Sequence, residues 1–162
     1  MKKSRLFKES GDTEMIISEI VALVTEYKDS ERLFALIMTE SAGNELAQSY
    51  CARGLTQMTK AALLDVEKIT KEKWYYDDLF DPVIAVKAGS IYFNMLLSKF
   101  KQDETLAVLA YSWGIGNVLK WLKSPADNSK IDESIPQDKK DYIWNYTYWK
   151  YFYRANFLHL KL

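Results

Sequence analysis

Cysteine and histidine each occur once, as Cys51 and as His159 near the end of the chain. A lone cysteine can form no intramolecular disulfide and can supply no cysteine-based zinc cluster. A Ser–His or Cys–His catalytic pair would need His159 as its base. The position of His159 instead favours a place on a C-terminal helix, where the helix dipole stabilises positive charge. These scarcities exclude much of the chemistry that thiols and imidazoles carry.

Long apolar runs and glycine-rich nucleotide motifs are also missing. No stretch of about 18 apolar residues is present, so no transmembrane helix is predicted. Neither G-x-x-x-x-G-K nor G-x-G-x-x-G occurs, which leaves a nucleotide site without support. Residues 1–15, MKKSRLFKESGDTEM, begin with the positive charges of a signal peptide but lack its apolar stretch and cleavage site. Either the protein is not exported by that route, or its signal has already been removed.

An excess of charge of either sign is absent as well, because 22 Lys and Arg balance 22 Asp and Glu. This balance argues against a nucleic-acid binder, whose surface is usually basic, and against attraction to anionic lipid. The 162 residues are 48% hydrophobic, as expected for one soluble globular domain.

Apolar residues recur at helical spacing, and no segment shows the alternation of a half-buried strand. Seven helices are predicted, over residues 14–28, 31–40, 60–70, 82–101, 104–113, 117–123 and about 137–158. Residues 42–54 and 124–135 are predicted to be loops. The sequence therefore predicts an all-α fold.

Residues typical of helix ends support these boundaries. Ser30, Thr59, Asp81 and Asp103 are predicted N-caps, and Asp81 is followed by a proline suited to the first helical position. The helix over 104–113 is predicted to end at Gly114, and Gly116 is predicted to be a break before the helix over 117–123. The core-facing residues predicted for the helix over 82–101 are Ile84, Ala88, Ile91, Tyr92, Met95 and Phe100.

Glu40 is the candidate catalytic residue, because it ends a predicted buried helix beside a polar loop. Burial and the negative end of a helix dipole both raise the pKa of a carboxylic acid. A raised pKa suits a general acid near neutral pH. The alternative is a frayed helix end with Glu40 in water, and position alone leaves both interpretations open.

Residues 39–58, TESAGNELAQSYCARGLTQM, carry the first of four collinear motifs. It contains Glu40-Ser41, then Ser49 nine positions after the glutamate, then Gly54-Leu55 and Gln57. The other three are LFDPVIAVKAG at 79–89, AYSWGIGNV at 110–118 and IPQDKKDYIWNY at 135–146. In this order the motifs resemble the catalytic domain of soluble lytic transglycosylases, in the goose-type lysozyme-like superfamily.

The chain departs from the family pattern at several positions, so the resemblance is to a divergent member. A glycine expected before Ala52 is missing, and Thr56 and Lys60 replace the usual Met and Pro. In the third motif, Ser112, Trp113 and Ile115 replace Asn, Ala and Pro.

The resemblance implies a lysozyme-like domain of about seven helices around a glycan-binding cleft. Residues 1–29 would contribute an N-terminal helix of the same domain, and residues 30–158 would form the catalytic part. The implied reaction cleaves the β-1,4 bond between N-acetylmuramic acid and N-acetylglucosamine and leaves a 1,6-anhydromuramoyl product. Glu40 would act as general acid and then as base, without a cofactor or a metal.

The same resemblance implies the substrate-binding residues Ser41, Ser49, Gly54, Gln57, Tyr111 and Tyr142. Each also has a structural interpretation, as a turn residue, a cap or a core tyrosine. Trp113 suits sugar stacking or core packing equally. Glu45, five positions after Glu40, could in principle serve as a second acid, but no family pattern supports that role.

The implied partner is the glycan strand of peptidoglycan, in the periplasm or cell envelope, with an envelope or secretion-machine partner left open. No nucleic acid and no stable membrane insertion are expected. Two alternatives remain: a hydrolytic goose-type lysozyme, and a non-catalytic peptidoglycan-binding relative.

Aromatic residues crowd the last predicted helix. Tyr142, Tyr146, Trp149, Tyr153 and Phe157 share one face, and core packing is a better interpretation of this face than a glycan platform. Trp144, Tyr148, Tyr151 and Phe152 lie on the other sides, which predicts a helix buried on most of its surface.

Overall fold

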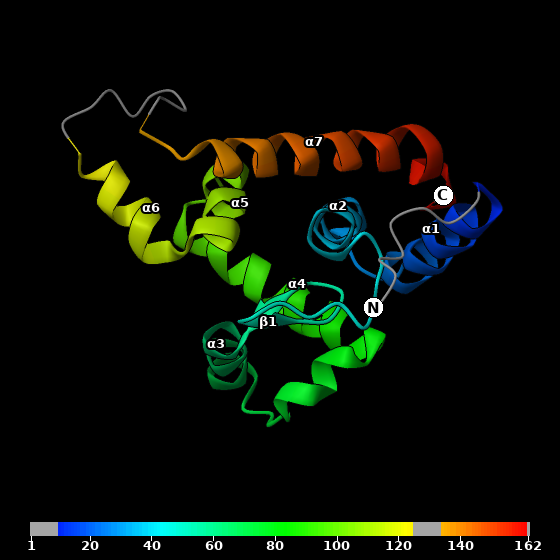
Figure 1. The fold of residues 1–162 in the computed structure, drawn as a ribbon, viewed down its shortest axis with the longest axis horizontal. Coiled ribbons are helices and arrows are strands. Elements are labelled where there is room, and N and C mark those ends of the chain that lie inside the picture. The colour runs from blue at the N-terminus through cyan, green and yellow to red at the C-terminus, as the bar shows by residue number, and fades with distance from the viewer. Residues whose placement is uncertain (1–9, 125–133, 162) are drawn as a thin grey trace.

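The structure, a computed structural model, describes residues 10–124 and 134–161. The elements in chain order are α1 (Ser10–Val24), α2 (Ser30–Ser41), β1 (Ala52–Arg53), β2 (Met58–Thr59), α3 (Lys60–Thr70), η1 (Tyr76–Phe80), α4 (Pro82–Lys99), α5 (Glu104–Trp113), α6 (Ile115–Leu122), α7 (Gln137–Phe157) and η2 (Leu158–Lys161). The all-α prediction is confirmed (Figure 1). The two strands were not predicted, because two residues are too short for alternation to be seen.

α2 is the central helix of the fold. Its residues from Leu33 to Met38 are all buried. It packs most extensively against α7 and also contacts α1 and α4, so it lies enclosed among them (Figure 1). A helix that is apolar on all sides is stable only inside a protein. Its buried position places the end of α2, and with it Glu40, at the edge of the core.

Local capping sets the starts of three helices where the sequence predicts them. The carboxylate of Asp81 accepts hydrogen bonds from the backbone N–H groups of Val83 and Ile84, at 2.8 and 3.3 Å. Thr59 caps α3 and Asp103 caps α5 in the same way. These bonds satisfy N–H groups that the first helical turn leaves unpaired.

The predicted cap at Ser30 is wrong, because Ser30 is already the first residue of α2 and Asp29 is the N-cap. The Ser30 hydroxyl is buried and has no hydrogen-bond partner in the described structure. The predicted break at Gly116 is also wrong. Gly114, with a φ of 88°, ends α5 as predicted and alone separates it from α6, so Gly116 lies within α6. The predicted loop over 124–135 falls mostly outside the described residues.

The predicted inward face of α4 is only partly right. Ala88 and Phe100 are buried, but the other predicted residues are half-buried. The other buried apolar side chains of α4, which were not predicted, are Ala85, Val86, Phe93, Leu96 and Leu97. α4 packs against α3 and η1 as well as against α5, α1 and α2, so its contacts do not follow a single stripe.

The predicted core face of α7 is confirmed. Tyr146 and Tyr153 are buried, and the ring centroids of Tyr153 and Phe34 lie 5.2 Å apart. The prediction that α7 is buried on most of its surface is wrong. Trp144, Tyr148 and Tyr151 are 74%, 60% and 62% exposed, because they lie on the helix face turned away from α2.

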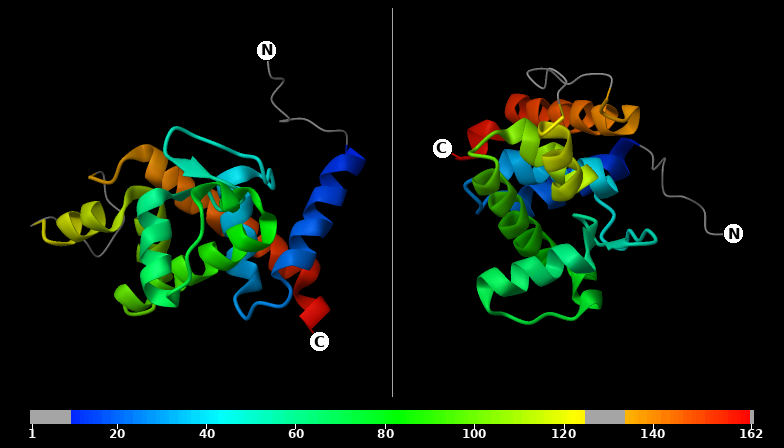
Figure 2. Two further views of the ribbon diagram at one scale, coloured as in Figure 1. Left: turned by 90° about the horizontal axis from the view of Figure 1, so that it is seen from below. Right: turned by 90° about the vertical axis from the view of Figure 1, so that its left-hand side faces the viewer.

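The segment between α2 and α3 runs outside the helical body (Figure 2). β1 and β2 pair antiparallel within it, with Ala52 opposite Thr59. None of the helices in the described parts of the chain has the length and apolar character needed to cross a membrane.

Candidate active site

Glu40 lies in the last turn of α2, one residue before the helix ends. Ala42 then adopts a left-handed conformation, and its backbone N–H donates to Met38 O at 3.2 Å. The Glu40 side chain is therefore half-buried at a fixed helix end and does not extend from a frayed one. Burial raises the pKa of Glu40 from 4.5 to about 7.

Tyr142 of α7 contacts Glu40 directly. Its hydroxyl donates to Glu40 Oε1 at 2.5 Å. This hydrogen bond, together with the positive charge of Lys139, lowers the pKa of Glu40 but does not cancel the effect of burial. The pKa of Tyr142 itself is well above its usual value, because of burial and the nearby carboxylate. Tyr142 therefore stays protonated and serves Glu40 as a hydrogen-bond donor.

Tyr111 of α5 belongs to the same surroundings. Its hydroxyl donates to the backbone oxygen of Thr56 at 2.7 Å, which ties α5 to the segment between β1 and β2. Burial and the charge of Glu40 raise the pKa of Tyr111 well above its usual value. The structure thus brings Glu40, Tyr111 and Tyr142 together from three helices.

Thr56 has a structural role that the sequence did not indicate. Its side chain is buried, and its hydroxyl donates to Ala85 O at 3.2 Å. A Cβ added to Gly89 of α4 would lie 2.6 Å from Thr56 Cγ2, so the absence of a side chain at Gly89 makes room for Thr56. These contacts anchor the backbone that receives the Tyr111 hydrogen bond.

The two serines of the first motif have backbone partners within their own segments. Ser41 Oγ donates to Ile37 O at 3.1 Å, one helical turn back. Ser49 is exposed, and its hydroxyl accepts from the Ala52 N–H at 3.1 Å. In the described structure neither hydroxyl bonds to Glu40.

Gln57 and Gly54 shape the loop that follows α2. Gln57 Nε2 donates to Ala47 O at 2.9 Å and to Gly54 O at 3.0 Å, which closes the loop on itself. Gly54 has a φ of 76°, and a Cβ there would lie 1.9 Å from Leu79 O of η1. The positive φ and the close approach of the η1 backbone together explain why glycine stands at position 54.

η1 holds this loop in place from outside. The Tyr76 hydroxyl donates to Cys51 O at 2.9 Å and is 3.2 Å from Met58 O, so it connects the residue before β1 to β2. Arg53 pairs with Asp77, and its guanidinium lies 4.3 Å from the centroid of the Tyr76 ring. The loop near Glu40 is therefore braced at its outer edge.

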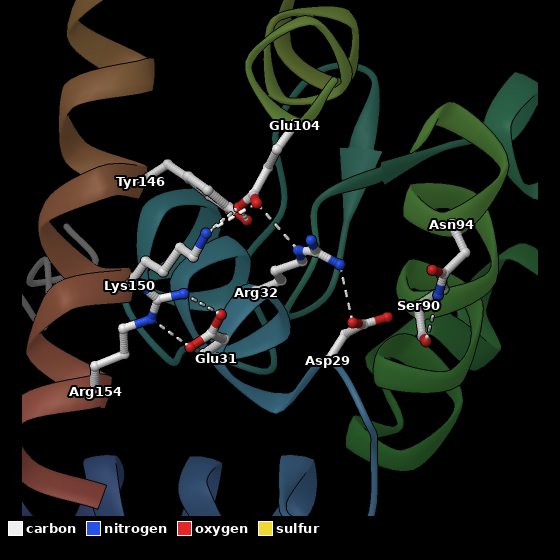
Figure 3. A network of polar contacts seen from close by, with 9 residues as sticks. All are labelled: Asp29, Glu31, Arg32, Ser90, Asn94, Glu104, Tyr146, Lys150 and Arg154. Atoms are coloured by element: carbon white, nitrogen blue, oxygen red, sulfur yellow. Dashed lines mark hydrogen bonds and ion pairs between the residues drawn. The ribbon is translucent and has the colours of Figure 1, made fainter. Parts of the chain in front are cut away.

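A polar network fixes α7 against α2 and α5 (Figure 3). Glu104 accepts from Tyr146 Oη at 2.8 Å, from Lys150 Nζ at 2.7 Å and from Arg32 Nε at 3.2 Å. Burial raises the pKa of Glu104, but these donors together hold it below its usual value. Since Tyr146 lies one turn after Tyr142, the network also sets the position of Tyr142 relative to Glu40.

Other candidate residues have limited parts in the site. Trp113 is half-buried and packs against the core beside Tyr111, which favours its core interpretation. Glu45 is half-buried in the loop. Within residues 10–124 and 134–161, no group of three or more His, Cys, Asp or Glu side chains is placed to hold a metal ion. The chemical capacity of the site is that of one carboxylic acid able to give and take a proton near neutral pH.

This helical arrangement, with an acid at the end of its central helix, defines a lysozyme-like domain. Residues 18–134 match the family described as the Transglycosylase SLT domain, and the chain belongs to that family. It is 32% identical over 126 residues to a Haemophilus influenzae protein assigned as a soluble lytic murein transglycosylase, over 74% of this chain and 21% of that protein. It is 29% identical over 140 residues to membrane-bound lytic murein transglycosylase F of Pasteurella multocida, over 80% of this chain and 25% of that protein.

The fold is also similar to a solved structure, the 70 kDa soluble lytic transglycosylase of Escherichia coli. The TM-score is 0.73 and the identity 25%, over 83% of this chain and 24% of that protein. The chain therefore spans about a fifth to a quarter of the length of the relatives it matches.

Proposed function

We propose that the chain is a peptidoglycan lytic transglycosylase in which Glu40 is the catalytic acid and base. The observation that carries the proposal is the state of Glu40, a half-buried carboxylic acid with a pKa of about 7 and a fixed hydrogen bond from Tyr142. Membership of the Transglycosylase SLT domain family supports the substrate class.

In the first step, protonated Glu40 gives its proton to the glycosidic oxygen between N-acetylmuramic acid and N-acetylglucosamine. The bond from the anomeric carbon to that oxygen breaks, and the N-acetylglucosamine part leaves with the proton. The acetamido group of the muramoyl sugar stabilises the positive anomeric carbon. Near its pKa, Glu40 has a large protonated fraction, which this step needs.

In the second step, the Glu40 carboxylate accepts the proton of the muramoyl C6 hydroxyl. The C6 oxygen then attacks the anomeric carbon and closes the 1,6-anhydro ring, and Glu40 is protonated again. Water takes no part, so one carboxylate serves both steps. The Tyr142 hydrogen bond supports the carboxylate form that exists between them.

Tyr111 and Tyr142 line the surroundings of Glu40 in this proposal, and Ser41, Ser49, Gly54 and Gln57 shape the adjoining loop. These four residues make hydrogen bonds to nearby backbone groups. Those bonds support a role in holding the loop surface that the glycan would meet. We further propose that residues 30–158 form the catalytic part and that α1, which packs against α2 and α4, completes the same domain. Peptidoglycan as the proposed substrate supports a location in the periplasm or cell envelope.

Digestion of purified sacculi with the full chain, followed by mass spectrometry of the muropeptides, tests the function. We expect 1,6-anhydromuramoyl ends, which are lighter than reducing ends by one water. Reducing ends would show a hydrolytic lysozyme instead. Binding to sacculi without any released muropeptide would show a non-catalytic relative.

A further inference from the structure

Lys139 lies in the first turn of α7, on the side of the helix that meets Glu40. Its backbone N–H donates to Pro136 O at 3.0 Å. Tyr142 follows three positions later, and residues at this spacing lie on one helix face. The Tyr142 hydroxyl reaches Glu40 Oε1 at 2.5 Å, so the face that carries Lys139 is turned toward the carboxylate.

The Lys139 side chain is held against the protein. It is 24% exposed, whereas its partner Asp138 is 70% exposed, and Lys139 Nζ lies 3.0 Å from Asp138 Oδ2. A cation in the first turn of a helix is opposed by the helix dipole. The ion pair with Asp138 offsets that cost and limits where the ammonium can lie.

Two helices carry the polar groups around Glu40. α7 supplies Tyr142 and Lys139, which both lower the pKa of Glu40. α5 supplies Tyr111, whose own pKa is raised by the charge of Glu40. Both phenols have pKa values well above the usual range and remain neutral. Among these groups Lys139 is therefore the one that brings a positive charge, and that charge opposes the effect of burial on the pKa of Glu40.

We propose that Lys139, held by its ion pair with Asp138, is a positioning residue that sets the balance between the acid and carboxylate forms of Glu40. The proposal deepens the proposed function and rests on it for its effect on turnover, because the two steps need opposite forms of Glu40. Asp138 moderates the influence of Lys139 by neutralising part of its charge.

The direct test is a carbon-13 NMR titration of the full chain labelled at its glutamate carboxyl carbons, with Glu40→Gln used to assign the Glu40 signal. In Lys139→Met and in Lys139→Gln, the Glu40 pKa should rise by about 0.3 pH unit or more. Lys140→Met removes the same charge from the next position, about 100° around the helix, and should change it less. A smaller rise or a fall in both Lys139 variants overturns the proposal, as does an equal rise in Lys140→Met.

Asp138→Asn tests the ion pair with the opposite sign. It should lower the Glu40 pKa, because the charge of Lys139 is then no longer partly neutralised. The effect should shrink when Lys139 is already Met, since coupled residues are not additive. Equal effects in the two backgrounds would overturn the role of the pair.

Failure of this inference and failure of the proposed function give different results. If no muropeptides are released but the Glu40 pKa moves as stated, the function fails and the role of Lys139 stands. If anhydro ends form but the Glu40 pKa does not move in the Lys139 variants, the role of Lys139 fails alone. When the proposed function and the role of Lys139 both hold, the descending limb of the pH–rate profile moves to higher pH in Lys139→Met, because Glu40 then stays protonated to a higher pH.

Discussion

The hydroxyl of Tyr142 donates a 2.5 Å hydrogen bond to Glu40, a residue 102 positions earlier in the chain. It joins the end of α2 to the first turns of α7. At the other end of the same helix pair, Arg154 Nε pairs with Glu31 at 2.7 Å. The two contacts pin both ends of the pair, so the carboxylate and its donor are held in fixed relation before any substrate arrives.

Replacing Glu40 by Gln should lower turnover on sacculi at least about 10²-fold, because an amide cannot give or take the proton. Muropeptide release over time measures this. Glu45→Gln, a change of the same kind in the adjoining loop, should retain activity. Full activity in Glu40→Gln would remove Glu40 from the mechanism.

The same variant should be more stable than the parent at high pH. The folded pKa of Glu40, about 7, lies above its ordinary value of 4.5, so the folded state binds the proton more tightly than the unfolded chain. Stability therefore falls as pH rises from about 4.5 to about 7, and the loss is complete above that range. The Glu40→Gln variant does not lose stability in this way, because its amide does not ionise.

Thermal unfolding of both proteins checks this stability effect. The Tm of Glu40→Gln minus that of the parent should be larger at about pH 8 than at about pH 5. A difference that does not change with pH would show that burial does not raise the pKa of Glu40.

Tyr142→Phe should raise the pKa of Glu40, because the carboxylate loses its hydrogen-bond donor. A hydrogen bond to a charged group contributes about 1.5–3 kcal/mol, which corresponds to an upward shift of about 1 pH unit or more. Turnover should fall about 10-fold or more, since the carboxylate form is needed for ring closure. The pH–rate profile measures both effects.

Tyr148→Phe is the matched control for that variant, because Tyr148 lies on the exposed face of the same helix. It should leave the profile unchanged. A profile that moves equally in the two variants would contradict a specific role for the Tyr142 hydroxyl.

Gly54→Ala should destabilise the protein by about 2 kcal/mol or more, since the added Cβ meets Leu79 O and the residue has a positive φ. Gly116→Ala adds the same methyl group within α6, where no atom of the described residues beyond the adjoining helix backbone lies within 4 Å of the new Cβ. It should be neutral or stabilising by up to about 1 kcal/mol. Urea unfolding compares the two, and equal effects would contradict the packing at Gly54.

Much of the fold is local in origin and could be predicted from the sequence. The Asp81 cap accepts from the backbone N–H groups two and three residues later, so its signal lies within a few residues. The error at Ser30 has the opposite cause, because its hydroxyl is covered by packing that no local pattern records. On α7, periodicity showed which aromatic residues share a face. It also indicated the core face, but it could not show that the other sides stay exposed, because aromatic residues occur on those sides too.

The candidate site was likewise only partly predictable from the sequence. Glu40 could be singled out from its place at a helix end, and Tyr111 and Tyr142 from the resemblance of the later motifs. Lys139 was missed, although its spacing of three from Tyr142 would have placed it once the face of α7 toward Glu40 was known. Ser49 and Gln57 were expected to meet substrate, and their observed partners are backbone groups of the loop.

The sequence by itself determined the helices, most of their caps and the acid at the end of α2, because these depend on neighbouring residues. Only the tertiary structure decided that the pKa of Glu40 is about 7, because that value is a balance between burial by the packed helices and contacts from α7. Desolvation and hydrogen bonds over 102 positions exist only once the chain has folded.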